Sequence, residues 1–112
     1  MVACNDAECS SGETTELDST GIAGQANSMA LGANGFPVIS YYDRSNQDLK
    51  LARCSNARCT AAVLSVEDSI GNSTTGTGHG TTSIAVAPDG RIGISYFDAN
   101  VDTLKIAVLP AS

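Results

Sequence analysis

The chain has 112 residues, of which 42% are hydrophobic and 16% charged, and twelve Asp and Glu residues against six Lys and Arg give a net charge of −6. This negative charge and the lack of any cluster of basic residues argue against nucleic acid or an anionic membrane surface as a partner. The longest apolar runs, such as Ala61–Leu64, are far shorter than the ~20 residues that span a bilayer, so we expect a soluble protein.

Short strands are expected along the whole chain. Gly, Ser, Thr and Asn are abundant, Trp is absent, and apolar residues nowhere recur with the i, i+3, i+4, i+7 spacing of an amphipathic helix. This composition is typical of strands separated by turns, so we predict an all-β fold. In chain order, the expected strands cover residues 1–4, 12–17, 27–31, 37–43, 49–54, 60–67, 82–87, 92–98 and 104–109.

The chain contains an internal repeat. When the sequence is shifted by 55 positions, Ser28–Cys54 aligns with Ser83–Leu109 without a gap, and ten of the 27 positions are identical. Each copy contains three expected strands, with an Asn-Gly or Asp-Gly pair between the first two. Such a pair between apolar runs is a strong hairpin signal.

A second self-match, at a shift of 50 positions, supplies a fourth strand. Cys4–Cys9 aligns with Cys54–Cys59, and Asp18-Ser-x-Gly aligns with Asp68-Ser-x-Gly. The repeating unit is therefore predicted to be a four-stranded antiparallel meander of about 50 residues. Residues 1–27 hold the end of a third strand and a fourth strand, 28–71 a complete unit, and 72–112 a linker and a three-stranded unit.

The centres of the two copies, GFPVISYYDRSNQDLKLARC and GRIGISYFDANVDTLKIAVL, resemble the blades of bacterial β-propeller proteins built from repeated ISYYD…LKxAxC units. The resemblance implies that the meanders are propeller blades and that residues 1–112 form a single module of about two blades. Because propellers close with ~4–8 blades, it also implies that a homo-oligomer, with a trimer favoured, completes the ring. Rings of two or four copies, or a chain that is part of a longer protein, are the alternatives. A neighbour's 12–17 segment would complete the last blade, where residues 1–4 and 106–109 compete for one third-strand position.

Two local disulfides are expected, Cys4–Cys9 and Cys54–Cys59. Each pair flanks a four-residue turn at an equivalent point of the repeat, where facing positions bring β-carbons to the ~3.5–4.5 Å that a disulfide needs. A four-thiolate zinc site is the alternative, although Cys-x4-Cys is wider than the usual knuckle. Paired cysteines indicate an oxidising compartment, so we expect an extracellular or periplasmic protein whose secretion signal was removed or lies upstream.

Asp43 and Asp98 end the second strand of each copy, and Lys50 and Lys105 begin the third. We expect cross-strand ion pairs in which each Asp lies opposite its Lys, with an Asx-type turn after each Asp. A ligand or cation role for these carboxylates is the alternative.

Candidate ligand-binding residues lie at one end of the predicted blades. His79, the only histidine, lies in a Gly/Thr-rich connection that, in propellers, emerges on the same face as the turn between the second and third strands. Arg44, Asn46 and Asn100 lie in those turns and are predicted to bind ligand with it. One histidine without a neighbouring Cys or His forms no zinc or nucleophile–base site, so we predict no catalytic residue, metal or cofactor. A solvated loop is the alternative for His79.

These observations favour a non-catalytic secreted module that self-assembles and binds extracellular ligands such as glycans between its blades. A self-assembling or fragmentary scaffold without a ligand is the alternative. A glycosidase is less favoured, because it needs two carboxylates ~5–9.5 Å apart, which Asp43 or Asp98 would supply only around the cavity of a closed ring. The Trp-ended Asp-box of sialidase-type repeats is also absent.

Overall fold

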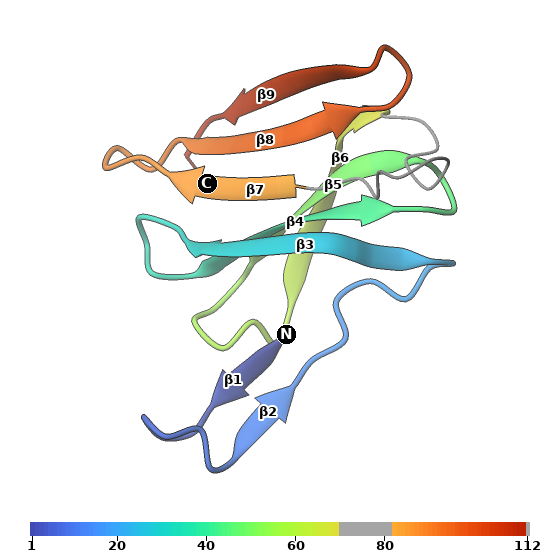
Figure 1. The fold of residues 1–112 in the computed structure, drawn as a ribbon. Coiled ribbons are helices and arrows are strands. Elements are labelled where there is room, and N and C mark those ends of the chain that lie inside the picture. The colour runs from blue at the N-terminus through green and yellow to red at the C-terminus, as the bar shows by residue number, and fades with distance from the viewer. Residues whose placement is uncertain (70–81, 112) are drawn as a thin grey trace.

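The computed structural model describes residues 1–69 and 82–111, and within these ranges the chain is all-β, without helix. Three antiparallel sheets follow one another along the chain (Figure 1). The two-stranded sheet contains β1 (Val2–Cys4) and β2 (Gly12–Thr14). The four-stranded sheet contains β3 (Ala23–Leu31), β4 (Pro37–Asp43), β5 (Asp48–Cys54) and β6 (Ala62–Ser69), and the three-stranded sheet β7 (Thr82–Val86), β8 (Ile92–Asp98) and β9 (Thr103–Leu109).

Within each sheet, every strand pairs with its neighbours along the chain, so the predicted meanders are confirmed. Three strands differ from the prediction by two or more residues at an end. β3 begins at Ala23 because two register shifts, with Ala26 at a φ of +53°, let it follow β4 further than expected. β2 ends at Thr14 and β6 runs from Ala62 to Ser69. No helix long and apolar enough to cross a membrane occurs within the described ranges.

Equivalent hairpin turns have equivalent chemistry in the two repeat copies. Gly35 and Gly90 adopt φ values of +80° and +91°, the left-handed region that glycine tolerates best. The preceding Asn34 and Asp89 each accept a hydrogen bond from the backbone N–H two residues further on, at 2.9 and 3.1 Å. The Asn-Gly and Asp-Gly signals thus form the turns that the sequence predicts.

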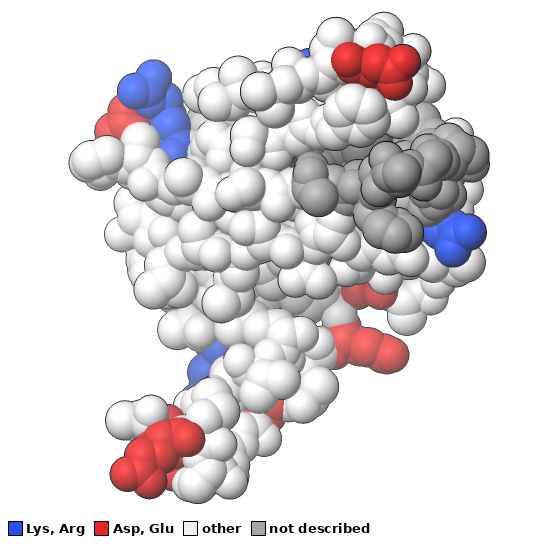
Figure 2. Space-filling view, in the orientation of Figure 1, with Lys and Arg blue, Asp and Glu red and all other residues white. Residues whose placement is uncertain are grey.

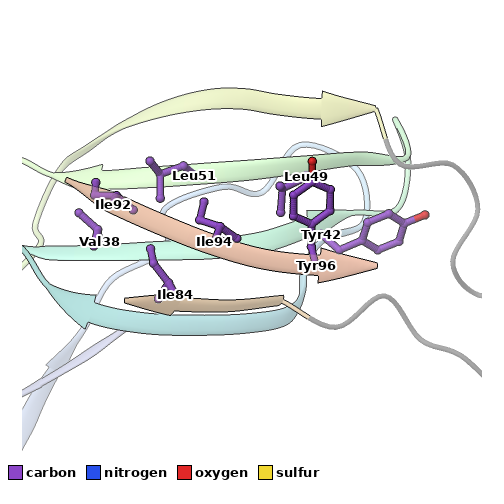
Figure 3. Close-up of a cluster of buried hydrophobic side chains, with 8 residues drawn as sticks. All are labelled: Val38, Tyr42, Leu49, Leu51, Ile84, Ile92, Ile94 and Tyr96. Atoms are coloured by element: carbon purple, nitrogen blue, oxygen red, sulfur yellow. The ribbon is translucent and has the colours of Figure 1, made fainter. Parts of the chain in front are cut away.

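The main core lies between the four-stranded and three-stranded sheets (Figure 3). Alternation along the strands places apolar residues on the facing sides of both sheets. The cluster consists of Val38, Tyr42, Leu49 and Leu51 on one side and Ile84, Ile92, Ile94 and Tyr96 on the other. The first strands of these sheets, β3 and β7, lie side by side (Figure 1). Thr82 Oγ1 connects them by donating a hydrogen bond of 2.6 Å to the Ala26 carbonyl.

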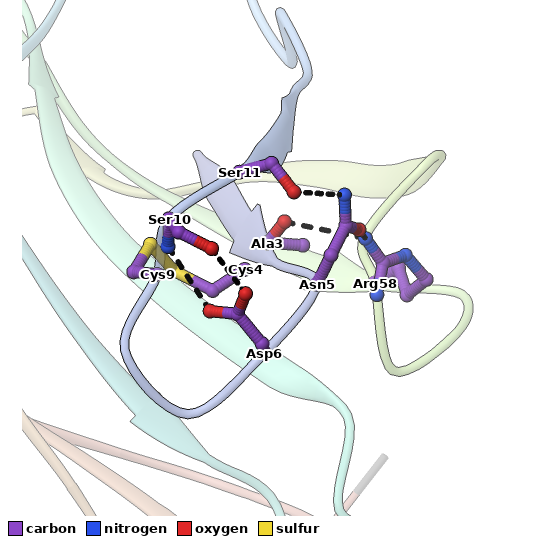
Figure 4. The surroundings of a disulfide bond; sticks show 8 residues. All are labelled: Ala3, Cys4, Asn5, Asp6, Cys9, Ser10, Ser11 and Arg58. Atoms are coloured by element: carbon purple, nitrogen blue, oxygen red, sulfur yellow. Dashed lines mark hydrogen bonds between the residues drawn. A yellow bond between two sulfur atoms is a disulfide. The ribbon is translucent and has the colours of Figure 1, made fainter.

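Both predicted disulfides are present, with Cα–Cα distances of 4.8 Å, so the alternative zinc ligation is not adopted. Each bridge ties the end of a strand to the following turn. Around Cys4–Cys9 the Asp6 carboxylate accepts hydrogen bonds from Ser10, and Arg58 donates to the Ala3 carbonyl at 3.2 Å (Figure 4). Disulfides are typical of oxidising environments, so the bridges are compatible with an extracellular or periplasmic location.

Candidate functional site

A polar cluster joins the two-stranded sheet to the four-stranded sheet. Asp18, in the segment after β2, accepts hydrogen bonds on Oδ2 from the Tyr41 hydroxyl and from Lys50 Nζ, both at 2.7 Å. Lys50 Nζ also lies 3.6 Å from Asp43 Oδ2. We call these four residues the first junction cluster. The side chains of Asp18 and Lys50 are only 5% and 13% exposed, so the ion pair is largely shielded from water.

The same arrangement recurs between the four-stranded and three-stranded sheets. Asp68, near the end of β6, accepts a hydrogen bond of 2.6 Å from the Tyr96 hydroxyl on β8. Lys105 Nζ on β9 lies 2.7 Å from Asp98 Oδ2 and 3.6 Å from Asp68 Oδ2. These four residues form the second junction cluster, which corresponds to the first by the repeat. In both clusters an aspartate, which lies in or after the last strand of one sheet, contacts a tyrosine and a lysine of the next sheet along the chain.

The predicted ion pairs are confirmed, but their geometry differs from the prediction. Lys50 lies directly opposite Tyr41, and Asp43 lies opposite Asp48, so Lys50 reaches Asp43 along a diagonal. The predicted Asx turn is confirmed after Asp98, which accepts the backbone N–H of Asn100, two residues on, at 2.9 Å. Asp43 instead accepts the backbone N–H of Asn46, three residues on, at 3.2 Å.

The first junction cluster fixes the protonation states of its members. The hydrogen bond from Lys50 lowers the pKa of Asp18 to about 2, and the same contact raises the pKa of Lys50. Burial, and then the hydrogen bond to Asp18, raises the pKa of Tyr41. At neutral pH the cluster therefore holds an ionised carboxylate, an ammonium and a protonated phenol, whose donors are directed at the carboxylate.

In the second junction cluster, the pKa values of an aspartate, the lysine and the tyrosine shift in the same directions as in the first. Lys105 lowers the pKa of Asp98, and Asp98 raises that of Lys105, while burial and then Asp68 raise the pKa of Tyr96. Lys105 is 41% exposed, so water screens this pair more than its counterpart. Within the described ranges, no group of three or more His, Cys, Asp or Glu residues could hold a metal ion. The chemistry of both clusters is that of hydrogen-bonded links between sheets.

A cavity of about 470 Å³ lies between the two-stranded sheet and the face of the four-stranded sheet that turns away from the main core. The two-stranded sheet covers this face only in part, and Met29 is still 56% exposed. The cavity is lined by Met1, Val2, Thr15, Glu16, Leu17, Asp18, Gly24, Asn27, Met29, Ile39, Tyr41 and Ala52.

The three-stranded sheet has an open apolar face on its other side. Along β9, Leu104, Ile106 and Val108 alternate with residues that point toward the main core, and they are 83%, 68% and 61% exposed. Phe97 on β8 is half-buried. We call the surface formed by these four side chains the open face. Contiguous apolar patches of this kind mark interaction surfaces or sites of aggregation.

The predicted ligand residues occupy equivalent turns at one end of adjacent sheets (Figure 1). Arg44 is exposed in the β4–β5 turn. The Asn46 amide donates to Asp43 Oδ2 at 2.9 Å, and the Asn100 amide in the β8–β9 turn donates to the Ser69 carbonyl at 3.0 Å. Both amides therefore support local structure. His79 lies outside the described residues.

The role of Asp18 and Asp68 was missed by sequence reasoning, although a signal was present. The self-match at a shift of 50 positions pairs these two aspartates. Their partners are distant in the sequence, with Tyr41 and Lys50 lying 23 and 32 residues from Asp18. A repeated acidic residue just after a predicted fourth strand is the feature that would have identified the junctions.

Comparison with protein-family models, curated proteins and solved structures finds no match for the chain.

Proposed function

We propose that the chain is a β-propeller module whose four-stranded and three-stranded sheets are blades and whose main activity is head-to-tail assembly with further copies. The observation that carries the proposal is a difference in burial between repeat-equivalent residues. Leu49 and Leu51 are 0% exposed in the main core, whereas their counterparts Leu104 and Ile106 are 83% and 68% exposed. The open face thus carries the kind of apolar side chains that a second sheet covers in the four-stranded sheet.

The cavity supplies the matching surface at the other end of the chain. Met29, Ile39, Tyr41 and Ala52 line it, and their repeat counterparts are Ile84, Ile94, Tyr96 and Ala107. The first three of these counterparts belong to the main core, and Ala107 packs against it. The chain therefore carries one complete core between sheets and the two separate halves of a second core.

The repeat indicates that a second copy of the chain covers the open face. Its cavity wall would meet the open face as the three-stranded sheet meets the four-stranded sheet within the chain. Such a contact is heterologous and closes into a ring when successive rotations return to the start. Three copies would give six blades, within the usual range for propellers. Burying each large apolar side chain of the open face would contribute about 1.5–3 kcal/mol.

Measurement of mass in solution by sedimentation equilibrium tests the proposal. We expect about three times the chain mass of 11.4 kDa, and a loss of assembly on Leu104→Asp. Val101→Asp is the matched control, because Val101 is 57% exposed but lies in the β8–β9 turn, outside the open face. A wild-type chain that stays monomeric at all concentrations would contradict the proposal.

A second candidate function, binding of extracellular ligands such as glycans, is supported by the turn end of the sheets. Arg44 and Asn100 place polar groups at equivalent turns of adjacent sheets. We expect secretion, in keeping with the two disulfides. A glycan array probed with the assembled protein and with Arg44→Ala tests this function. Binding that Arg44→Ala abolishes supports it, and absence of binding by the wild type removes it.

A further inference from the structure

Among the residues that the structure describes, the three-stranded sheet has an unpaired edge where its counterpart has a strand. β5 pairs with β4 on one side and β6 on the other, whereas in residues 1–69 and 82–111 β9 has β8 as its one partner. A long edge strand with exposed apolar side chains is a template for pairing with another chain, and proteins usually cover or shorten such an edge. The identity of the covering strand is indicated by the repeat.

The segment Gly12–Asp18 corresponds to Ala62–Asp68, most of β6, at the shift of 50 positions. Only Gly12–Thr14 forms a strand, paired with β1 through three positions, and Thr15 exchanges backbone hydrogen bonds with Met1. Glu16 and Leu17 have no strand partner within the described part of the chain. Part of the segment is therefore available to pair with a strand other than β1.

We propose that Gly12–Asp18 of one copy forms the fourth strand of the three-stranded sheet of the next copy, in the register of β6 on β5, and that β1 is displaced. This inference rests on the proposed assembly and adds which strands exchange. The β5–β6 pair Ala52↔Leu64 corresponds by the repeat to Ala107 opposite Thr14. In the same way, the pair Lys50↔Val66 corresponds to Lys105 opposite Glu16.

Charge complementarity supports this register. Val66 is apolar and lies opposite Lys50, whereas the donated segment would place the acidic Glu16 opposite Lys105. Opposite charges at facing positions stabilise an antiparallel pair. The donated segment also contains Glu13 and Asp18 and no basic residue, and Figure 2 shows further acidic side chains at the turn end of the two-stranded sheet.

β1 is the weaker competitor for the segment. It spans three residues, and Val2 is 57% exposed, whereas β9 spans seven residues held by β8 along its full length. The Cys4–Cys9 disulfide links β1 only to its own turn, so β1 can leave with the bridge intact. Apart from the β2 ladder, Arg58 donates hydrogen bonds to the Ala3 carbonyl on β1 and to Asn5 Oδ1 in the turn that follows. Exchange thus replaces a short ladder by a longer one.

Cysteine cross-linking between two separately purified variants tests the proposed register. All four native cysteines form disulfides, so Ala107→Cys and Thr14→Cys introduce the reactive thiols. Ser55 N–H donates to the Ala61 carbonyl, and alternation along the β5–β6 ladder then makes Ala52↔Leu64 a non-hydrogen-bonded pair. The mapped pair would take the same place, where facing side chains lie closest. We expect a covalent dimer when the two variants are mixed and oxidised, and none when Val101→Cys replaces Ala107→Cys.

The competition with β1 is tested by Ala3→Pro. Proline removes one backbone donor of the β1–β2 ladder, so displacement of β1 should become easier and the dissociation constant of the assembly should fall by about fivefold. Ala7→Pro, in the exposed turn between the cysteines, is the control and should leave it unchanged. Weaker assembly of Ala3→Pro, or assembly without the cross-link, overturns strand exchange while the proposed function stands. Absence of any assembly overturns both.

Discussion

The four-stranded and three-stranded sheets are built from copies of one repeat, yet they differ in how much of their apolar surface is covered. The four-stranded sheet buries the face with Leu49 and Leu51 completely, while the three-stranded sheet exposes Leu104 and Ile106. Similar local patterns thus produce the same strands, and the presence of a neighbouring sheet decides the burial. The comparison separates what a repeat specifies by itself from what assembly must supply.

The largest effect is expected from truncating equivalent side chains of the two sheets. Leu51→Ala should lower the free energy of unfolding by about 2–5 kcal/mol, because it leaves a cavity in the main core. Ile106→Ala should cost less than about 1 kcal/mol in the unassembled chain, because Ile106 is already exposed. Urea unfolding at low protein concentration measures both.

Raising the protein concentration sharpens this comparison. In the assembled protein Ile106→Ala should become as costly as a core truncation, since stability is then coupled to association. Equal costs of Ile106→Ala at low and high concentration would show that the open face stays uncovered.

The two disulfides offer a second contrast between regions. Each closes a short loop of the same length, so loop closure alone predicts a similar loss of about 2 kcal/mol when both cysteines of a pair become serine. Cys54 and Cys59 are 7% and 0% exposed, whereas Cys4 and Cys9 are exposed. The buried pair should therefore cost about 1–3 kcal/mol more, because its new hydroxyls lose water.

Thermal and urea unfolding of the two double serine variants measure this difference. A larger loss from the Cys4–Cys9 pair would mean that the two-stranded sheet contributes more to the stability of the chain than its small buried surface indicates.

The junction clusters provide a contrast that depends on pH. The pKa of Asp18 falls from 3.8 to about 2 on folding, so its contribution is present above pH 4 and is lost as the pH falls toward 2. Asp18→Asn should cost about 1–2 kcal/mol at pH 7 and make the loss of stability between pH 4 and pH 2 less steep. Asp68→Asn should cost less at pH 7, because water screens its partner Lys105.

Urea unfolding of both variants at pH 7 and at several values down to pH 2 measures these effects. Asn keeps the size of the side chain, so packing is preserved in both. An unchanged pH profile for Asp18→Asn would show that other carboxylates account for the acid sensitivity.

The strands, their meander order and both disulfides were predictable because they depend on local alternation, turn residues and the repeat. The diagonal placement of Lys50 and the bulges of β3 were not, because register shifts depend on how strands pair and not on composition. Asp18 was missed because it lies outside any strand and meets partners that only the packing of two sheets brings close. The open face was predictable as apolar.

The smallest contrast concerns the equivalent glycines of the first hairpin turns. Alanine at either position would adopt a left-handed φ, which costs about 1 kcal/mol. At Gly35 an added β-carbon meets nothing within 4 Å, whereas at Gly90 it would approach the β-carbon of Ala111 at 2.9 Å and that of Ala33 at 3.2 Å. Gly90→Ala should therefore destabilise the chain by a few tenths of a kcal/mol more than Gly35→Ala, or by somewhat more if Ala111 does not move aside. Thermal unfolding of the two variants measures the difference, and equal losses would show that the segment after β9 yields freely at this turn.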